Sequence, residues 1–238
     1  MDKLKNTLLL VRARINRVLF PMQGYWTAVK TTKPISSKFG FDRGRPIDRY
    51  WIEDFLEKHK NYIKGNCMEV TGSAYTLKYG ADKVKKVDVL DVDTNNKKAT
   101  IYGDLRDLHL VISDNTYDCI ILTHVLGLID NLDKAVSECH RILKPGGVLI
   151  ATSSCFSPTY DTKSNYWRFT PQGAKYLFGK YFKENNLKIF SYGNVLTGQC
   201  FWAGMSQEDL TEEQLKYNDP KYPCVVGIQA IKEGGHDE

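Results

Sequence analysis

Residues 117–153 read YDCIILTHVLGLIDNLDKAVSECHRILKPGGVLIATS, and they decide the fold class. The apolar, β-branched runs at 117–123 and 147–153 predict two buried strands. Between them, the segment 131–143 has apolar residues at helical spacing and ends in the stop signal KPGG. A strand, a helix and a second strand in this order predict two parallel strands joined by a right-handed crossover. The sequence therefore predicts an α/β fold built on a parallel sheet.

The same pattern extends to both sides of this unit. A helix is expected at roughly 47–60, and a second at 170–183, where Thr170 is a suitable N-cap and Pro171 a suitable first helical residue. The segments after the first two strands are too short for full helices. Further strands are predicted by β-rich runs at 67–71, 86–92, 98–103, 187–193 and 223–232.

The composition suits one α/β domain with a sizeable core, or at most two small domains, since the chain has 238 residues, of which 42% are apolar and 26% charged. The net charge of +5 favours an anionic small molecule or a membrane surface and falls short of a nucleic-acid-binding signature. The six cysteines form no C-x-x-C pair and the five histidines show no metal spacing, so we expect reduced thiols and no metal site. No apolar run approaches the about 18 residues of a membrane span, and the N-terminus lacks signal-peptide features. We therefore expect a cytoplasmic protein without a transmembrane segment.

The N-terminal region predicts a separate element. Residues 3–20 have the pattern of a basic amphipathic helix, which Pro21 ends. This helix either caps the domain or contacts a membrane surface or a partner protein. The expected organisation is an N-terminal helix and loop arm at 1–45, one domain at 46–232 and a disordered tail at 233–238.

Acidic residues stand at the ends of three successive predicted strands. The first strand ends at Glu69, the second near Asp88 or Asp91, and the third at Asp104. Open parallel sheets bind ligands outside the carboxyl ends of their strands, and ionised carboxylates accept hydrogen bonds from a ribose diol or an adenine amine. Each acid alone is equally well explained as a turn former or helix cap. A dinucleotide is disfavoured because no G-x-G-x-x-G follows the first strand.

The ordered string of CMEVTGS (67–73), IYGDL (101–105), YDCIILTHVL and ECHRILKPGGVLIATS resembles the class I S-adenosylmethionine-dependent methyltransferases. The flanking segments FGFDRGRPIDRYWIEDFL, YWRFTPQGAKYLF and YGNVL are similar to a narrower bacterial group, which is associated with glycosyltransferases and with surface-polysaccharide or small-metabolite biosynthesis. The resemblance covers roughly residues 34 to 232. It implies a Rossmann-like fold: a mostly parallel seven-stranded sheet with an antiparallel last strand and helices on both faces. It also implies S-adenosyl-L-methionine as cofactor and S-adenosyl-L-homocysteine as product.

The resemblance also implies roles for individual residues in binding the cofactor. The first motif, EVTGSAYT, departs from the family in having a single glycine. Arg43 is expected to compensate by pairing with the carboxylate of the cofactor. The expected cofactor-binding residues are Glu69, Thr71 and Gly72 in the first motif, Asp88 or alternatively Asp91 for the ribose, Asp104 and Leu105 for the adenine, and Thr123 beside the methyl group.

His124 is the candidate general base, since it stands at a strand end and a histidine titrates near neutral pH; the alternative is a structural histidine. Tyr166, Trp167 and Arg168 are expected at the acceptor site, or else as packing residues ahead of the next helix. Arg43, Arg49 and Tyr50 are expected to form a lid, in which Arg49 and Tyr50 bind the substrate; the alternative is a plain surface loop. The expected activity is O-methylation of a saccharide, sugar phosphate or related small metabolite. The alternative is a non-catalytic module that docks a glycosyltransferase, and a nucleic-acid or protein methyltransferase ranks last because no concentrated basic stripe is present.

Overall fold

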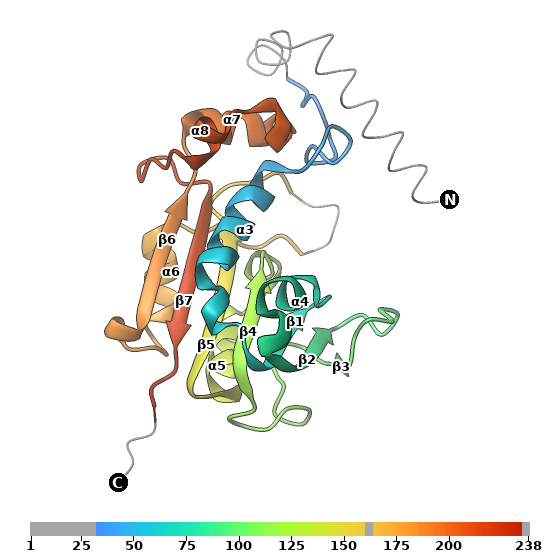
Figure 1. The fold of residues 1–238 in the computed structure, drawn as a ribbon, viewed down its shortest axis with the longest axis vertical. Coiled ribbons are helices and arrows are strands. Elements are labelled where there is room, and N and C mark those ends of the chain that lie inside the picture. The colour runs from blue at the N-terminus through green and yellow to red at the C-terminus, as the bar shows by residue number, and fades with distance from the viewer. Residues whose placement is uncertain (1–31, 160–163, 235–238) are drawn as a thin grey trace. The chain divides into compact units, whose positions relative to one another are not determined.

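The structure is a computed structural model that describes residues 32–159 and 164–234 (Figure 1). The helix predicted at 3–20 and the end of the predicted tail lie outside the described residues. The chain divides into two compact units. Of the described residues, the smaller unit comprises 32–53, 156–158 and 191–225, and the larger comprises 54–155, 159, 164–190 and 226–234.

A seven-stranded sheet organises the larger unit (Figure 1). Its spatial order is β3-β2-β1-β4-β5-β7-β6. The β1–β2, β1–β4, β2–β3 and β4–β5 pairs are parallel. The bonds from Gly146 N to Lys232 O and from Lys232 N to Gly147 O show that β7 runs antiparallel to β5. The strands are β1 (Gly65–Val70), β2 (Val84–Asp91), β3 (Ile101–Tyr102), β4 (Tyr117–Thr123), β5 (Leu143–Ser154), β6 (Leu187–Tyr192) and β7 (Val225–Ile231).

This sheet confirms the predicted fold class, including the antiparallel last strand. The chain leaves β1 toward β2 and β3 on one side, whereas β4 and β5 lie on the other. The strand order therefore reverses between β1 and β4, and a crevice opens outside the carboxyl ends of the strands at such a reversal. The fold thus predicts a ligand site at the ends of β1 and β4.

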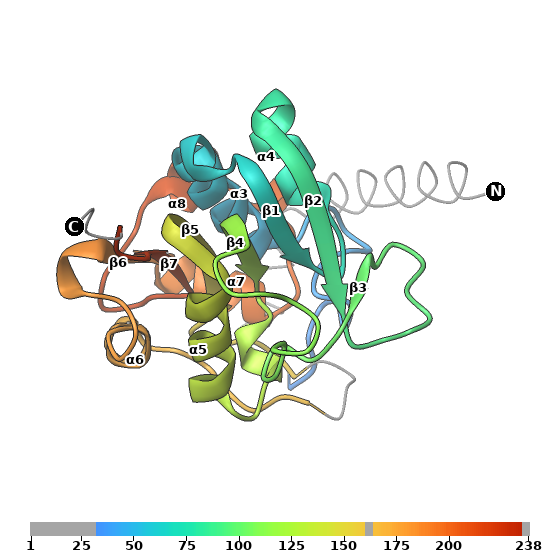
Figure 2. The ribbon, with the colours of Figure 1, turned by 90° about the horizontal axis from the view of Figure 1, so that it is seen from below.

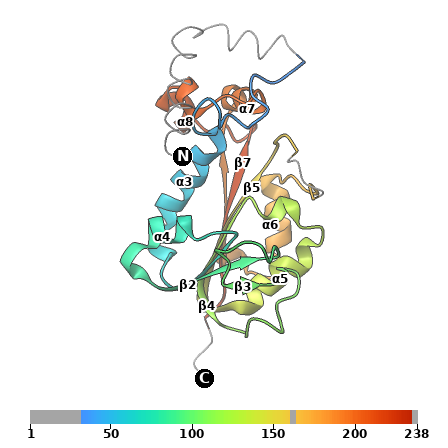
Figure 3. The same ribbon diagram turned by 90° about the vertical axis from the view of Figure 1, so that its right-hand side faces the viewer.

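Helices cover both faces of the sheet. Figure 3 shows α5 and α6 on one side of the strands and α4 on the other, and Figure 2 agrees. Phe55 and His59, in the last turns of α3, pack against Phe190 of β6. None of the described helices is long and apolar enough to span a membrane. The helices are α3 (Ile47–His59), α4 (Ala74–Gly80), α5 (Leu132–Ile142), α6 (Pro171–Phe178), α7 (Val195–Trp202) and α8 (Glu212–Lys216).

Helix α6 begins as the sequence predicts and ends earlier. The Thr170 side chain accepts a hydrogen bond from Gly173 N at 3.0 Å, and Pro171 is the first helical residue. The helix expected to continue to residue 183 instead ends at Phe178, and the chain turns after Gly179. Phe182 continues the apolar spacing from within this turn, where it is buried and its ring packs near that of Phe178.

The central strands β4 and β5 are covered on both faces, and most of their residues are buried. The apolar face of α5 packs on them, with Ala135, Val136, Cys139 and Ile142 buried. All six cysteines are free thiols, and all except Cys155 are buried.

Candidate cofactor and acceptor site

Glu69 organises the turn between β1 and α4. Its side chain is buried, and its carboxylate accepts hydrogen bonds from Thr76 N at 2.8 Å, Thr76 Oγ1 at 2.7 Å and Tyr75 N at 3.3 Å. Burial raises the pKa of Glu69, while these donors act in the opposite direction. Glu69 therefore caps the first turn of α4 and fixes the path of the turn at residues 71–73.

In the loop after β1, the residue with a left-handed backbone is Thr71 and not Gly72. Thr71, the first residue after β1, has a φ of +66°, a left-handed conformation that β-branched residues rarely adopt. Gly72 does not need a left-handed backbone, and a Cβ added to it would meet no heavy atom within 4 Å. The glycine is therefore not required by packing inside the protein. It leaves open space beside the loop, which suits a ligand that approaches the backbone closely.

The structure distinguishes the two candidate ribose acids by their place in β2. Asp88 lies within the strand, opposite Met68 of β1, and its Oδ2 accepts hydrogen bonds from Lys86 Nζ at 2.9 Å and from the Tyr117 hydroxyl at 3.1 Å. Burial and the Asp88 charge raise the pKa of Tyr117. Asp88 thus joins β2 to β4 inside the sheet.

Asp91 is the last residue of β2 and lies at the carboxyl edge. Its Oδ1 accepts a hydrogen bond from Asp93 N at 2.9 Å, and its Oδ2 accepts one from Asn96 Nδ2 at 2.6 Å. A carboxylate has about four acceptor positions, so two remain for a ligand. The placement favours Asp91 over Asp88 as the acid that binds a ribose.

Asp104 and Leu105 follow β3. The Asp104 carboxylate is bound by Arg106, whose Nε lies 2.9 and 3.0 Å from its two oxygens. Hydrogen bonding to Arg106 lowers the pKa of Asp104. Arg106 also pairs with Asp130, so it connects Asp104 to the segment before α5. Leu105 is buried in the main core cluster, which gives it a packing role.

Thr123 and His124 lie at the carboxyl end of β4, across the strand-order reversal from Thr71. Thr123 pairs in register with Thr152 of β5. His124 has a φ of +56°, and its N–H donates to Thr152 O at 2.9 Å. The Nδ1 of its ring lies 3.5 Å from Ser154 Oγ. Both side chains are half-buried, so the ring of His124 stands at the edge of the sheet beside the end of β5.

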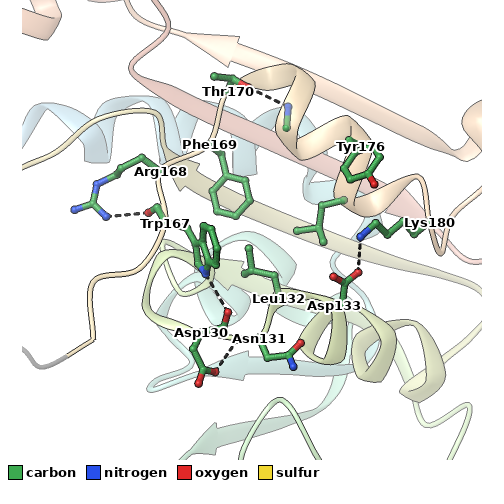
Figure 4. Close-up of a pocket in the computed structure, with 12 residues that line it drawn as sticks. Asp130, Asn131, Leu132, Asp133, Trp167, Arg168, Phe169, Thr170, Tyr176 and Lys180 are labelled. Atoms are coloured by element: carbon green, nitrogen blue, oxygen red, sulfur yellow. Dashed lines mark hydrogen bonds and ion pairs between the residues drawn. The ribbon is translucent and has the colours of Figure 1, made fainter.

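An open pocket of about 640 Å³ lies between the start of α5 and the segment 167–180, which includes α6 (Figure 4). Leu132, Phe169 and Leu177 supply apolar lining. The Trp167 indole borders the pocket and donates from Nε1 to Ile129 O at 2.9 Å.

Charged groups complete the lining of this pocket. Lys180 pairs with Asp133 at 2.8 Å, as the dashed line in Figure 4 shows. Trp167 and Arg168 both line the pocket, as expected of acceptor-site residues, whereas Tyr166 does not. The Arg168 guanidinium donates to Trp167 O at 2.9 Å. The sequence analysis did not predict that α5 and α6 contribute to the pocket. Two polar patterns could have indicated it: Asp130, Asn131 and Asp133 at a helix start, and Tyr176 and Lys180 one turn apart.

The remaining predicted residues belong to the smaller unit. Arg43 forms a two-pronged ion pair with Asp209, with Nε–Oδ2 at 3.2 Å and Nη2–Oδ1 at 3.0 Å. Its guanidinium therefore already has a carboxylate partner, and its pairing with a cofactor carboxylate stays a prediction. Arg49 and Tyr50 lie in the first turn of α3, and their role in a lid also stays a prediction.

The strand-end residues fit an adenosine-type cofactor with a cationic tail. Asp91 keeps acceptor capacity for a ribose diol. The Asp104 carboxylate already accepts from Arg106 N, Nε and Nη2, so its binding of an exocyclic amine stays a prediction. The open space beside Gly72 accommodates the tail next to the backbone. The acids disfavour a diphosphate at the same edge, because like charges repel.

Comparison with known proteins agrees with this chemistry. Residues 55–151 match a family model described as a methyltransferase domain. The chain is 34% identical over 94 residues to the ubiquinone/menaquinone biosynthesis C-methyltransferase of Haemophilus ducreyi, covering 39% of this chain and 33% of that protein. It is 30% identical over 144 residues to the demethylmenaquinone methyltransferase of Listeria welshimeri, covering 58% and 55%. The chain therefore spans between a third and about half of the length of these curated relatives.

Solved structures show the same fold. A SAM-dependent methyltransferase from Archaeoglobus fulgidus superposes with a TM-score of 0.53 and 16% identity, over 77% of this chain and 94% of that chain. The [4+2]-cyclase SpnF superposes with a TM-score of 0.53 and 14% identity, over 94% and 96%. The methyltransferase-domain match over residues 55–151 and the shared fold agree with the predicted cofactor, S-adenosyl-L-methionine. The resemblance to the narrower bacterial group stays a prediction.

Proposed function

We propose that this chain is an S-adenosylmethionine-dependent methyltransferase that methylates an oxygen of a saccharide, sugar phosphate or related small metabolite. The observation that carries the proposal is the position of His124. It stands at the end of β4, beside the strand-order reversal, and the segment that follows leads to the pocket bordered by Asp130. His124 therefore shares the carboxyl edge of the sheet with the proposed cofactor residues, and it precedes in the chain the segment that borders the pocket.

The bound cofactor supplies an electrophilic methyl group on a sulfonium. With the cofactor bound, Asp91 would accept hydrogen bonds from the ribose hydroxyls, and Asp104 would accept one from the adenine amine in exchange for part of its bonding to Arg106. Gly72 leaves room for the methionine end. Such positioning supplies much of the rate of a transfer reaction, because it replaces an encounter in solution with a fixed approach.

His124 would take the proton of the acceptor hydroxyl as the acceptor oxygen bonds to the methyl group and the methyl–sulfur bond breaks. A general base of this kind typically contributes about 10²–10⁴-fold to the rate. The Ser154 hydroxyl near Nδ1 restricts the orientation of the ring. The left-handed backbone of His124 is strained, and strain of this kind persists where the surrounding structure holds it and often marks a functional site.

The pocket is the proposed acceptor site. Its rim carries two exposed aromatic rings, Trp167 at 45% and Tyr176 at 73% exposure, whose faces suit the apolar side of a sugar ring. Asp130 and Asp133 offer carboxylate acceptors for sugar hydroxyls. Lys180 suits an anionic substituent such as a phosphate, although it is shared with Asp133.

The curated relatives favour a second candidate function, which is methylation of a ring carbon of a quinone precursor. Two of them carry names of quinone-biosynthesis methyltransferases. The apolar lining of Leu132, Phe169 and Leu177 would accommodate such a ring. The predicted non-catalytic docking role remains the third alternative, and the cyclase with the same fold illustrates that the fold alone does not fix the reaction.

A methyl-transfer assay separates these functions. The purified protein is incubated with methyl-labelled S-adenosylmethionine and with sugar phosphates, nucleotide sugars or a demethylated quinol. We expect label on the saccharide class, with an O-methyl signal in the NMR spectrum of the product. The His124→Ala variant should lose this transfer, whereas His109→Ala, which alters an exposed histidine, should retain it. Label on the quinol alone, as a C-methyl group, would instead establish the second candidate, and an active His124→Ala variant would remove the proposed base.

A further inference from the structure

The loop between β2 and β3 carries one side chain that joins two parts of the cofactor edge. Asn96 Nδ2 donates to Thr71 O at 2.9 Å and to Asp91 Oδ2 at 2.6 Å. Asn96 is itself held, because its Oδ1 accepts from Lys98 N at 3.0 Å and its carbonyl accepts from the Tyr102 hydroxyl at 3.2 Å. The amide therefore forms a bridge from the end of β1 to the end of β2.

The first end of this bridge supports the strained residue of the loop. Thr71 holds a φ of +66°, which glycine adopts freely and threonine does not. Its N–H donates to Leu90 O at 2.9 Å, and its carbonyl accepts from Asn96. Hydrogen bonds on both sides thus hold the peptide groups of Thr71 in a conformation that its side chain disfavours.

The second end orients the proposed ribose acid. One oxygen of Asp91 is fixed by Asp93 N and the other by Asn96, so the carboxylate plane is set before any ligand binds. A carboxylate held in this way loses less side-chain freedom on binding a diol than a free one does.

We infer that Asn96 is a positioning residue for the cofactor. Its hydrogen bond to Thr71 O holds the loop in a left-handed conformation that a glycine would adopt without support, and the first motif has only one glycine. Asn96 holds Thr71 and Asp91 in the arrangement that receives the ribose and the adjoining tail. This inference rests on the proposed function, since it takes Asp91 to bind the cofactor of a methyltransferase.

The test compares two asparagines of the same loop by calorimetric binding of S-adenosylhomocysteine. Asn96→Ala should weaken binding by about tenfold or more, as expected for a lost hydrogen bond to a charged group. Asn95→Ala is the matched control, because among the residues that the structure describes the Asn95 amide donates only to Asp93, within the same turn. This control should bind within about twofold of the wild type. Asn96→Asp should also bind weakly at neutral pH, because it places a second carboxylate against Asp91, and should recover as the pH falls and the pair shares a proton.

Two further readouts separate positioning from general stability. Hydrogen exchange of the Thr71 amide in the cofactor-free protein should accelerate in Asn96→Ala and stay unchanged in Asn95→Ala. Adding Thr71→Gly to Asn96→Ala should restore part of the lost affinity, because glycine adopts the left-handed conformation without support.

The inference is overturned if the wild type binds the cofactor product and Asn96→Ala binds equally well or more tightly. Tighter binding would mean that Asn96 occupies the place of the ribose. Unchanged exchange at Thr71, or no recovery with Thr71→Gly, would overturn the link to the strained loop. A folded wild type that does not bind at all would refute the proposed function instead, and hydrogen exchange would still report whether Asn96 holds Thr71.

Discussion

Replacing Gly72 by alanine adds one methyl group at the position where the loop after β1 faces open space. The new Cβ would meet no heavy atom of the protein within 4 Å, and the backbone there is not left-handed. Folding should therefore be unharmed, and the loss of unfolded-state freedom should stabilise the protein by about 0.4–1 kcal/mol. If the methionine end of the cofactor fills that space, the methyl group overpacks the site, which costs on the order of 1–3 kcal/mol. Binding should then weaken by roughly fivefold to more than hundredfold.

Two measurements on the same variant check this prediction: the free energy of unfolding from a urea titration, and the affinity for S-adenosylhomocysteine by calorimetry. Gly146→Ala is the matched control, because Gly146 also has no heavy atom near its Cβ but has a φ of +77°. It lies near the start of β5, away from the carboxyl edge. The control should lose about 1–2 kcal/mol of stability and keep its affinity. A Gly72→Ala protein that unfolds more easily, or that binds as tightly as the wild type, would refute the reasoning.

Three other predictions follow from the same edge of the sheet. Asp91→Asn should weaken cofactor-product binding about tenfold or more, measured by calorimetry, because an ionised acceptor is lost. Asp88→Asn should keep the affinity and lower the free energy of unfolding by about 1–3 kcal/mol, measured by urea titration, because its bonds inside the sheet are disturbed. The reverse pattern would mean that Asp88, and not Asp91, binds the ribose. His124→Ala should reduce kcat by about 10²–10⁴-fold while binding is retained, and steady-state kinetics with an unchanged kcat would contradict this. Arg106 lowers the pKa of Asp104, so the stability from this pair is present above the unfolded pKa of about 4 and is lost as the pH falls through the folded pKa. The destabilisation caused by Arg106→Gln, measured by urea titration, should therefore shrink toward low pH, and a pH-independent difference would exclude that coupling.

The sheet could be predicted from the sequence because its strongest signals are local. The buried strands at 117–123 and 147–153 and the helix between them agree with β4, β5 and α5 to within a few residues. Helix α6 was overextended because Phe182 continues the apolar period beyond Gly179, and apolar spacing does not reveal that the chain has already turned. The short helices α7 and α8 were missed, although capping boxes at Asn194 and Thr211 mark their starts.

The candidate site was predictable in its chemistry and less so in its geometry. Three strand-end acids were identified, but the choice between Asp88 and Asp91 depends on where β2 ends, which the β-rich run alone does not define. The bridge from Asn96 to Thr71 joins residues 25 positions apart, and no periodic pattern signals such a contact. The pocket also brings together residues that are distant in the sequence, from the start of α5 and from the segment around α6. Trp167 was therefore predicted, whereas its neighbours on α5 were not.

Binding of S-adenosylhomocysteine to the purified wild-type protein, measured by calorimetry, tests the central claim most directly. The account predicts one site with micromolar affinity, on the order of −8 kcal/mol, and loss of that binding in Asp91→Asn. A folded protein that shows no binding at millimolar ligand would contradict the claim that this edge of the sheet holds the cofactor of a methyltransferase.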